Sequence, residues 1–363
     1  MKKYLFFAAL TSVALASCVN DENDNTIDAP VPLTFEAPSV KTQTRAYAGE
    51  IAGVVYPENE SFQVFCRIYN DDAGFKGWET DGTYITKDYF DAAGEKASHD
   101  GSYWSTSTKH YWPSAGHALA FAAYSPAQDR LNAGATVTYG ADGLTITNFS
   151  PAADSEDQYD LMYSDRVSGL TKANNGNSHV ALTFHHALAS IVFSTSEAAE
   201  GMSYKITDLS IQGTIHPTGT FKQNYNESTK TDSPTWATSG STTVNYSPEI
   251  PAAGITVTTS PTIFTAGQSA LLLIPQSIPD DAQVTVQYEA TTETAPITTT
   301  EHTQVIKLKD FKLVDNASNT IETWERGKRY IYRISFGETS HIYFKPSVTE
   351  WKSGGTAVYT INN

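Results

Sequence analysis

Apolar and polar side chains alternate along much of the chain from residue 33 onward. Residues 61–69 give the clearest case, where one side of an extended chain carries Phe62, Val64, Cys66 and Ile68. A period of two predicts a β-strand with one apolar face. The same pattern predicts strands at 118–124, 135–139, 143–149, 180–184, 190–194, 203–212, 282–288, 328–336, 341–344 and 356–361.

Clusters of Gly, Pro, Asn, Asp and Ser separate these segments, as at residues 70–74 and 174–177. Such clusters are typical of turns between strands. No stretch has the apolar spacing of a long amphipathic helix. The sequence therefore predicts an all-β protein of the sandwich type. Two threonine-rich segments, 227–247 and 290–303, have no apolar face to bury, and we expect long loops or edge hairpins there.

The chain has 363 residues, a length that suggests two domains. The polar stretch 164–178 is the best candidate for a boundary. We therefore expect an N-terminal β-sandwich over residues 33–178 and a C-terminal β-sandwich over residues 179–363.

The first residues have the pattern of an export signal. Two lysines precede an apolar run over residues 4–14, which is too short to cross a bilayer and fits a secretory signal. The run ends in Leu15-Ala16-Ser17-Cys18, which resembles a bacterial lipobox, where the cysteine is acylated. We expect residues 1–17 to be a lipoprotein signal peptide and Cys18 to carry the lipid; the alternative is an ordinary signal peptide with an incidental cysteine. Two or three acyl chains on one residue form a stable membrane anchor.

Residues 18–32 are acidic, poor in large apolar groups and closed by two prolines, so we expect a tether without a core of its own. The whole chain has a formal net charge of −16, which excludes nucleic acid and anionic membrane surfaces as partners. Only one other cysteine, Cys66, is present, so no disulfide framework is expected if Cys18 is acylated. Its place on the apolar face of a strand predicts a buried, unreactive thiol.

No catalytic motif is visible. His185 and His186 are adjacent, so in a strand they point to opposite faces and cannot hold one metal ion together. A calcium loop among Asp154, Glu156, Asp157, Asp160 and Asp165 is conceivable, but the spacing is not that of an EF-hand. Hydrogen-bonded structural histidines and a solvated acidic loop are the favoured interpretations. We expect no enzyme activity, no metal and no cofactor.

Six aromatic residues suggest an alternative function. Their rings could stack on sugars, although aromatic residues in β-rich proteins more often fill a core. The residues are Trp78, Tyr103, Trp104, Tyr111, Trp112 and Trp236. The alternative is a surface lipoprotein that binds glycans.

Several motifs together resemble the fimbrillin-like (Mfa-like) lipoproteins of Bacteroidetes. The resemblance runs over nearly the whole chain after residue 32, and its combination of motifs is specific although each one alone is weak. The motifs are Leu33-Thr34-Phe35, Thr44-Arg45-Ala46, Tyr111-Trp112-Pro113, Leu119 to Pro126, Leu182 to Ile191, Leu272 to Gln276, Gly327 to Tyr330 and Val348 to Trp351.

The resemblance implies two transthyretin-like β-sandwich domains in tandem and a structural or adhesive subunit of a surface fimbrium (pilus). It also implies proteolytic maturation between Arg45 and Ala46, which frees the N-terminal segment. Other fimbrial subunits then assemble by strand exchange, and a host or bacterial receptor is a further possible partner. A missing strand exposes apolar pockets and unpaired backbone groups, and an added strand satisfies both.

The C-terminus departs from this pattern, because only twelve residues follow Trp351. The strand expected at 356–361 is either a donor strand of modest length or the last strand of its own domain. Stalk, anchor and tip roles therefore stay open.

Overall fold

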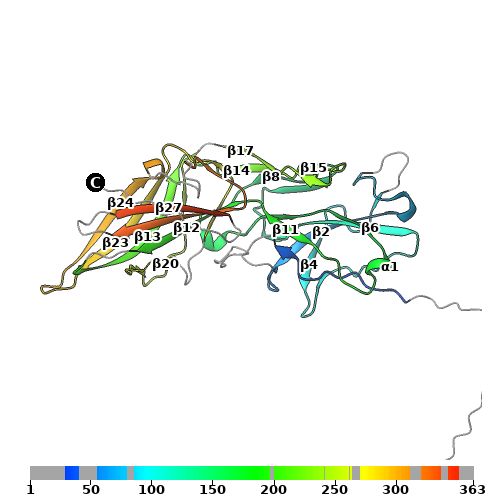
Figure 1. The fold of residues 1–363 in the computed structure, drawn as a ribbon, viewed down its shortest axis with the longest axis horizontal. Coiled ribbons are helices and arrows are strands. Elements are labelled where there is room, and N and C mark those ends of the chain that lie inside the picture. Colours follow the sequence, from blue (N-terminus) through cyan, green and yellow to red (C-terminus); the bar gives the residue numbers. More distant parts are fainter. Residues whose placement is uncertain are drawn as a thin grey trace, which may run out of the picture.

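The computed structural model describes residues 29–40, 55–79, 86–196, 200–240, 242–260, 262–263, 270–310, 320–336 and 342–350. The predicted all-β class is confirmed, since the one α-helix in these ranges, α1 (Lys172–Asn175), is a single turn. Figure 1 shows an elongated molecule in which the strands of the first half of the chain lie at one end and most strands of the second half at the other.

The largest sheet has nine strands in the order β1-β11-β9-β6-β2-β4-β5, with β10 paired to β6 and β3 to β2. Its longest pair is antiparallel and runs from Gln63 opposite Tyr124 to Asn70 opposite His117. The strands are β1 (Ser39–Val40), β2 (Ser61–Asn70), β3 (Lys87–Asp88), β4 (Glu95–His99), β5 (Trp104–Thr106), β6 (His117–Ser125), β9 (Met162–Ser164), β10 (Val167–Leu170) and β11 (Thr183–His186).

Both faces of this sheet are buried at its two central strands, β2 and β6. On β2, Phe62, Val64 and Cys66 belong to one apolar core, and Phe65 and Tyr69 belong to another on the opposite face. The alternation along β6 divides its side chains between the same two cores, with alanines at 118, 120, 122 and 123. A central strand that is covered on both sides reads as a continuous apolar run, as β6 does.

A four-stranded sheet covers the face that carries Phe65 and Tyr69. Its order is β17-β14-β8-β7, with β7 (Thr136–Gly140), β8 (Gly143–Phe149), β14 (Thr218–Lys222) and β17 (Thr235–Ser239). Phe221 of β14 lies opposite Ile146 of β8, and both are fully buried. We call the nine-stranded and four-stranded sheets together the N-terminal sandwich.

Strands from before and after residue 178, the expected domain boundary, pair within the same sheets. Strand β11 pairs with β9, and β14 pairs with β8, so residues beyond 178 complete both sheets of the N-terminal sandwich. The Trp236 indole reinforces this return of the chain by donating to the carbonyl of Ala187 at 2.7 Å. A division drawn by sheets would place residues 183–186 and 218–239 with the first half of the chain.

Two five-stranded sheets form the C-terminal sandwich around a second large core. One has the order β20-β12-β26-β27 with β21 beside β12, and the other β18-β13-β23-β24 with β19 beside β13. Ile191 and Tyr330 from the first sheet and Val286 from the second share this core. The strands are β12 (Ala189–Ser196), β13 (Met202–Gly213), β18 (Val244–Tyr246), β19 (Ile255–Thr256), β20 (Thr262–Ile263), β21 (Leu271–Leu273), β23 (Gln283–Thr292), β24 (Thr299–Lys307), β26 (Lys328–Phe336) and β27 (Ile342–Glu350).

Short elements complete the fold. Strands β15 (Tyr225–Asn226) and β16 (Thr231–Asp232) form one small pair, and β22 (Gln276–Ser277) and β25 (Thr323–Trp324) form another. Single turns of 3-10 helix occupy Asp71–Ala73, Gln128–Arg130, Ser155–Asp157 and Leu308–Asp310.

The predicted strands agree with the observed ones to within a few residues where alternation is strong. Residues 143–149 and 328–336 match β8 and β26 in full. The threonine-rich segments contain β17 and the part of the β23–β24 hairpin next to its turn, and β17 and β24 are both edge strands. The edge-hairpin interpretation of these segments is therefore confirmed.

Candidate functional site

Residues 31–40, here called the first strand, lie between two other segments of the N-terminal sandwich. On one side they run antiparallel to residues 104–112, with amide-to-carbonyl bonds from Leu33 to His110 and from Phe35 to Trp104, both at 2.9 Å. On the other side they run parallel to residues 180–184, where the amide of Val180 donates to the carbonyl of Thr34 at 2.9 Å. The first strand thus fills a gap between the β5 and β11 edges of the large sheet.

The apolar side chains of the first strand enter the core below it. Leu33, Phe35 and Val40 are buried, and Phe35 has no exposed surface. The Phe35 ring meets Phe62 and Phe121 edge to face, at centroid distances of 5.8 and 5.7 Å. Burial of three large side chains contributes about 5–9 kcal/mol at most, counted from surface removed from water.

The outer face of the first strand is polar. The Thr34 hydroxyl lies 2.6 Å from Nδ1 of His179, and the His179 ring stacks on Tyr103 with centroids 3.6 Å apart. The Ser39 hydroxyl lies 3.0 Å from that of Thr183. These contacts are partly or fully exposed, so each adds little compared with the buried side chains.

The chain leaves the first strand and returns beside it. The amide of Tyr56 donates to the carbonyl of Pro38 at 2.9 Å, and Val55 forms a bridge with Ser39. The intervening residues 41–54 lie outside the described residues, and with them the predicted maturation site Arg45–Ala46. The predicted lipidation site Cys18 and the C-terminal strand at 356–361 also lie outside them. Both ends of the segment that contains Arg45 therefore meet at one end of the first strand.

The Tyr56 side chain packs in the core beneath this end of the first strand. Its buried ring packs edge to face on Phe62, and its hydroxyl donates to the carbonyl of Ser61 at 2.9 Å. Burial raises the pKa of the Tyr56 hydroxyl far above its ordinary value of about 10. The phenol therefore stays neutral at any physiological pH.

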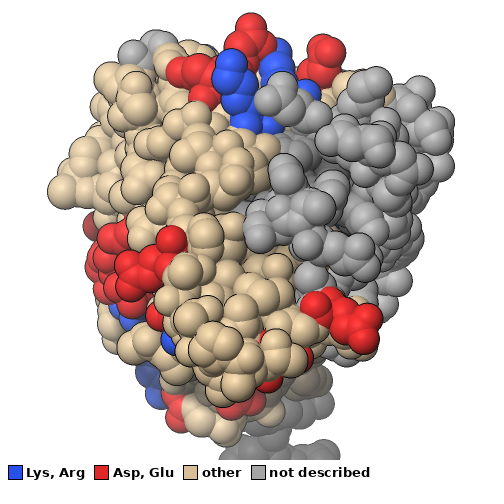
Figure 2. Space-filling model, turned by 90° about the vertical axis from the view of Figure 1, so that its left-hand side faces the viewer, with Lys and Arg blue, Asp and Glu red and all other residues tan. Residues whose placement is uncertain are grey.

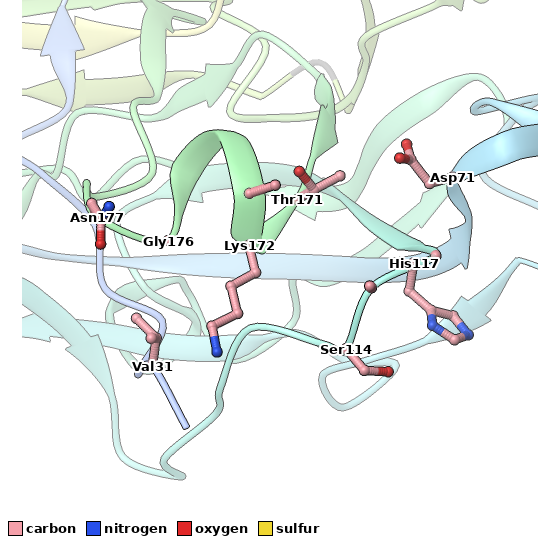
Figure 3. Close-up of a pocket in the computed structure, with 11 residues that line it drawn as sticks. Val31, Asp71, Ser114, His117, Thr171, Lys172, Gly176 and Asn177 are labelled. Carbon is pink, nitrogen blue, oxygen red and sulfur yellow. The ribbon is translucent and has the colours of Figure 1, made fainter. Parts of the chain in front are cut away.

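A cavity of about 560 Å³ opens at the other end of the first strand, beside Val31. Figure 3 shows the Lys172 side chain reaching from α1 toward the space between Val31 and Ser114. Its ammonium donates to the carbonyl of Ala29 at 3.1 Å. The middle of the first strand is fully packed, whereas its start lies over open space.

The two adjacent histidines take separate partners, as predicted. His185 lies 2.7 Å from a carboxylate oxygen of Asp165, and His186 lies 2.8 Å from one of Asp160. The second pair is fully buried. The acidic segment thus supplies structural partners for the two rings, and within the described residues no three His, Cys, Asp or Glu side chains gather as a metal site.

Cys66 is a free cysteine, and it is buried as its place on the apolar face of the strand predicted. Burial raises the pKa of its thiol well above the ordinary value, which disfavours the reactive thiolate.

Among the candidate sugar-binding aromatics, Trp78, Trp104 and Trp112 are core residues, while Tyr103 and Tyr111 are 41% and 37% exposed. The core interpretation holds for these three tryptophans.

The residues that surround the first strand could not be recognised from the sequence. In the sequence, residues 104–112 show only aromatic rings and one motif, and no local pattern distinguishes Tyr56. Val180 and Leu182 had a strand pattern, but their partner in the first strand lies more than 140 residues earlier. Nothing local to either segment specifies such a pairing.

Comparisons with known proteins identify one matching family and several solved structures of low sequence identity. A family model described as fimbrillin-like matches residues 68–351. A fimbrial protein from Bacteroides vulgatus is 16% identical with a TM-score of 0.55, over 88% of this chain and 100% of that one. The fimbrial anchor protein Mfa2 from Porphyromonas gingivalis is 11% identical with a TM-score of 0.30, over 90% of this chain and 100% of that one.

No curated protein sequence matches the chain. In the described part of the structure, no helix is both long enough and apolar enough to cross a membrane.

Proposed function

Because the chain belongs to the fimbrillin-like family, we propose that it is a structural or adhesive subunit of a surface fimbrium that assembles by exchange of its first strand. The observation that carries the proposal is the position of residues 31–40, which fill a gap between two strand edges. A second subunit's strand can make the same backbone bonds and fill the same apolar pockets.

Cleavage between Arg45 and Ala46 would change how the first strand is held. Before cleavage, the covalent link through residues 41–54 keeps the strand at a high effective concentration beside its groove. After cleavage, only the backbone bonds and the buried side chains such as Phe35 retain it. A donor strand of comparable apolar content then competes on equal terms, and residues 356–361 are the proposed donor in this chain.

Acylation of Cys18 would deliver the precursor to the outer membrane and the cell surface. Since Cys18 precedes Arg45, cleavage would also separate the assembled subunit from its anchor. The lipid and the first strand would leave together, so release from the membrane and opening of the groove become one event.

Limited trypsin digestion tests this sequence of events. Wild-type protein should be cut first after Arg45, lose the first strand and form ladders on native gels. Arg45→Ala should resist this cut and remain monomeric, with an unchanged melting temperature. Arg130→Ala, at an exposed arginine on the N-terminal sandwich, is the matched control and should behave as wild type. Ladders formed equally well by uncut protein would contradict the proposal.

Glycan binding is a second candidate function, favoured by one observation. Tyr103 and Tyr111 are exposed and belong to the segment that borders the first strand. Exposed tyrosine rings are suitable platforms for sugars. A glycan array with the monomer, repeated with Tyr103→Ala and Tyr111→Ala, tests it; binding that both variants retain would exclude these rings.

A further inference from the structure

Strand β24 is a long edge of the C-terminal sandwich. Its nine residues, Thr299–Lys307, pair with β23 from Thr291 opposite Thr299 to Gln283 opposite Lys307. The sheet ends at β24, and no strand of the described residues pairs with its outer side. Figure 1 shows the β23–β24 hairpin at the end of the molecule away from the N-terminal sandwich.

Both faces of β24 are in contact with solvent. Every residue of the strand is exposed except Ile306, which packs against the C-terminal core. Val305 alone leaves 47% of its surface in water. Natural proteins usually shorten, cover or twist away such an edge, because its free N–H and C=O groups are a template for another strand.

The charges of Glu301 and Lys307 on β24 have no opposite-charge partner among the described residues. Glu301 lies directly opposite Glu289 of β23, and Glu289 already forms an ion pair with Lys205 at 2.7 Å. Like charges that face each other across two strands destabilise the pair. At the other end, Lys307 has no ion pair or hydrogen bond from its side chain to the described part of the chain. The strand thus carries an unsatisfied acid and an unsatisfied base six residues apart.

We propose that β24 pairs antiparallel with β24 of a second copy of this chain, with Gln304 of each copy at the two-fold axis. This register places Glu301 opposite Lys307 of the second copy, and the symmetry repeats the contact at the other end. It also places Thr303 opposite Val305 and His302 opposite Ile306. Two opposite-charge pairs replace the local repulsion between Glu301 and Glu289.

The charges favour this register over the one centred on Thr303. With Thr303 at the axis, Glu301 would face Val305 and Lys307 would face Thr299, so both charges would stay unpaired. Figure 2 looks onto the end of the molecule that carries the hairpin, and among the described residues on this face the charged side chains form a few separate groups between uncharged ones. Two copies can therefore approach through this end despite the net charge of −16.

A single pair of strands buries less surface than a permanent interface, so the association should be weak and depend on concentration. It is suited to copies that are already crowded on one surface. The pairing does not involve the first strand, so Arg45→Ala should leave it unchanged and failure of one proposal does not affect the other.

Charge exchange tests the pairing in the full chain, with Cys18→Ser so that no lipid is attached. Sedimentation equilibrium at protein concentrations from about 1 µM to about 1 mM should show a monomer–dimer equilibrium. Glu301→Lys and Lys307→Glu should each weaken it by about tenfold, since each creates two like-charge pairs. The double variant should restore it, and an equimolar mixture of the two single variants should form mixed dimers.

A cysteine scan tests the register. Gln304→Cys should form a disulfide-linked dimer under mild oxidation, because residues directly opposite in an antiparallel pair have Cα atoms about 4.5–5.5 Å apart. Thr299→Cys is the matched control on the same strand; its two copies would be about 34 Å apart in this register and should not link. Cys66 is buried and should not interfere.

Two results would overturn the proposal. One is a monomer at every concentration tested. The other is a dimer that neither charge variant weakens and that Gln304→Cys does not capture, which would place the interface elsewhere.

Discussion

The two ends of the molecule differ in that one sheet edge is filled by a strand of the same chain and the other is left open. In the N-terminal sandwich, residues 31–40 fill the gap between β5 and β11 and bury Phe35 completely. In the C-terminal sandwich, no strand of the described residues pairs with the outer side of β24, and every residue of β24 except Ile306 is exposed. The filled edge is apolar and its partner belongs to the same chain, whereas the open edge is polar and charged.

The difference follows from what each edge would expose. An empty first-strand groove would present an aromatic core to water, which costs several kcal/mol and invites aggregation. The open β24 edge presents threonines, a glutamate and a lysine, which water solvates well. We infer that the first site suits a tight, one-time exchange and the second a weak, reversible contact.

The largest difference between the two edges should appear on truncation of one apolar side chain at each. Phe35→Ala should lower the free energy of unfolding by about 3–5 kcal/mol, because it leaves a cavity among Phe62 and Phe121. Val305→Ala should change it by less than about 0.5 kcal/mol, since Val305 is 47% exposed. Urea denaturation of both variants measures this, and equal losses would remove the basis of the comparison.

Cys66 reports whether the filled edge has opened, since it shares a core with Phe35. Thiol labelling of the uncut protein should be slow, because the thiol is buried and its raised pKa keeps it protonated. After cleavage at Arg45 and removal of the first strand, labelling at pH 8 should be at least about tenfold faster. Labelling of Gln304→Cys on β24 should be fast in both states, and any change there would show that the cut disturbs more than the groove.

Tyr56 allows a finer test of the filled edge through pH. Its pKa is raised by burial, so the folded state keeps the proton after the unfolded chain has lost it above about pH 10. The free energy of unfolding therefore falls as the pH rises above about 10. Tyr56→Phe should cost about 1 kcal/mol at pH 7, through loss of the bond to the carbonyl of Ser61, and should make the alkaline loss less steep.

Tyr246, in the C-terminal sandwich, is the control for that experiment. Burial raises its pKa to about 12, so it adds to the alkaline loss independently of the first strand. Tyr246→Phe should therefore reduce the alkaline loss in cut and uncut protein alike. The effect of Tyr56→Phe should be smaller once the first strand has been removed, and an effect that cleavage leaves unchanged would argue that Tyr56 does not sense the groove.

Much of the fold was predictable because the signal for it is local. Strands β8 and β26 alternate so regularly that their limits follow from the sequence, and the register of β2 correctly predicted a buried Cys66. The return of β14 to the N-terminal sandwich was not predictable, since the pairing of Phe221 with Ile146 joins residues 75 apart. Likewise, Phe35 belongs to a recognisable motif, but its position between Trp104 and Val180 is a property of the folded chain.

The smallest expected effect concerns the open edge in the monomer. Glu301 faces Glu289 across the hairpin, so Glu301→Gln should stabilise the isolated chain by about 0.2–0.5 kcal/mol at low ionic strength. Salt should reduce the gain, because both carboxylates are near the surface and screening acts on them. Glu36→Gln, at an exposed glutamate of the filled edge, is the control and should have no comparable effect. Denaturation at submicromolar protein, where β24 is unpaired, gives the value. The absence of a gain at Glu301 would mean that Lys205 already neutralises both acids of the hairpin, and the electrostatic reason for self-pairing would be lost.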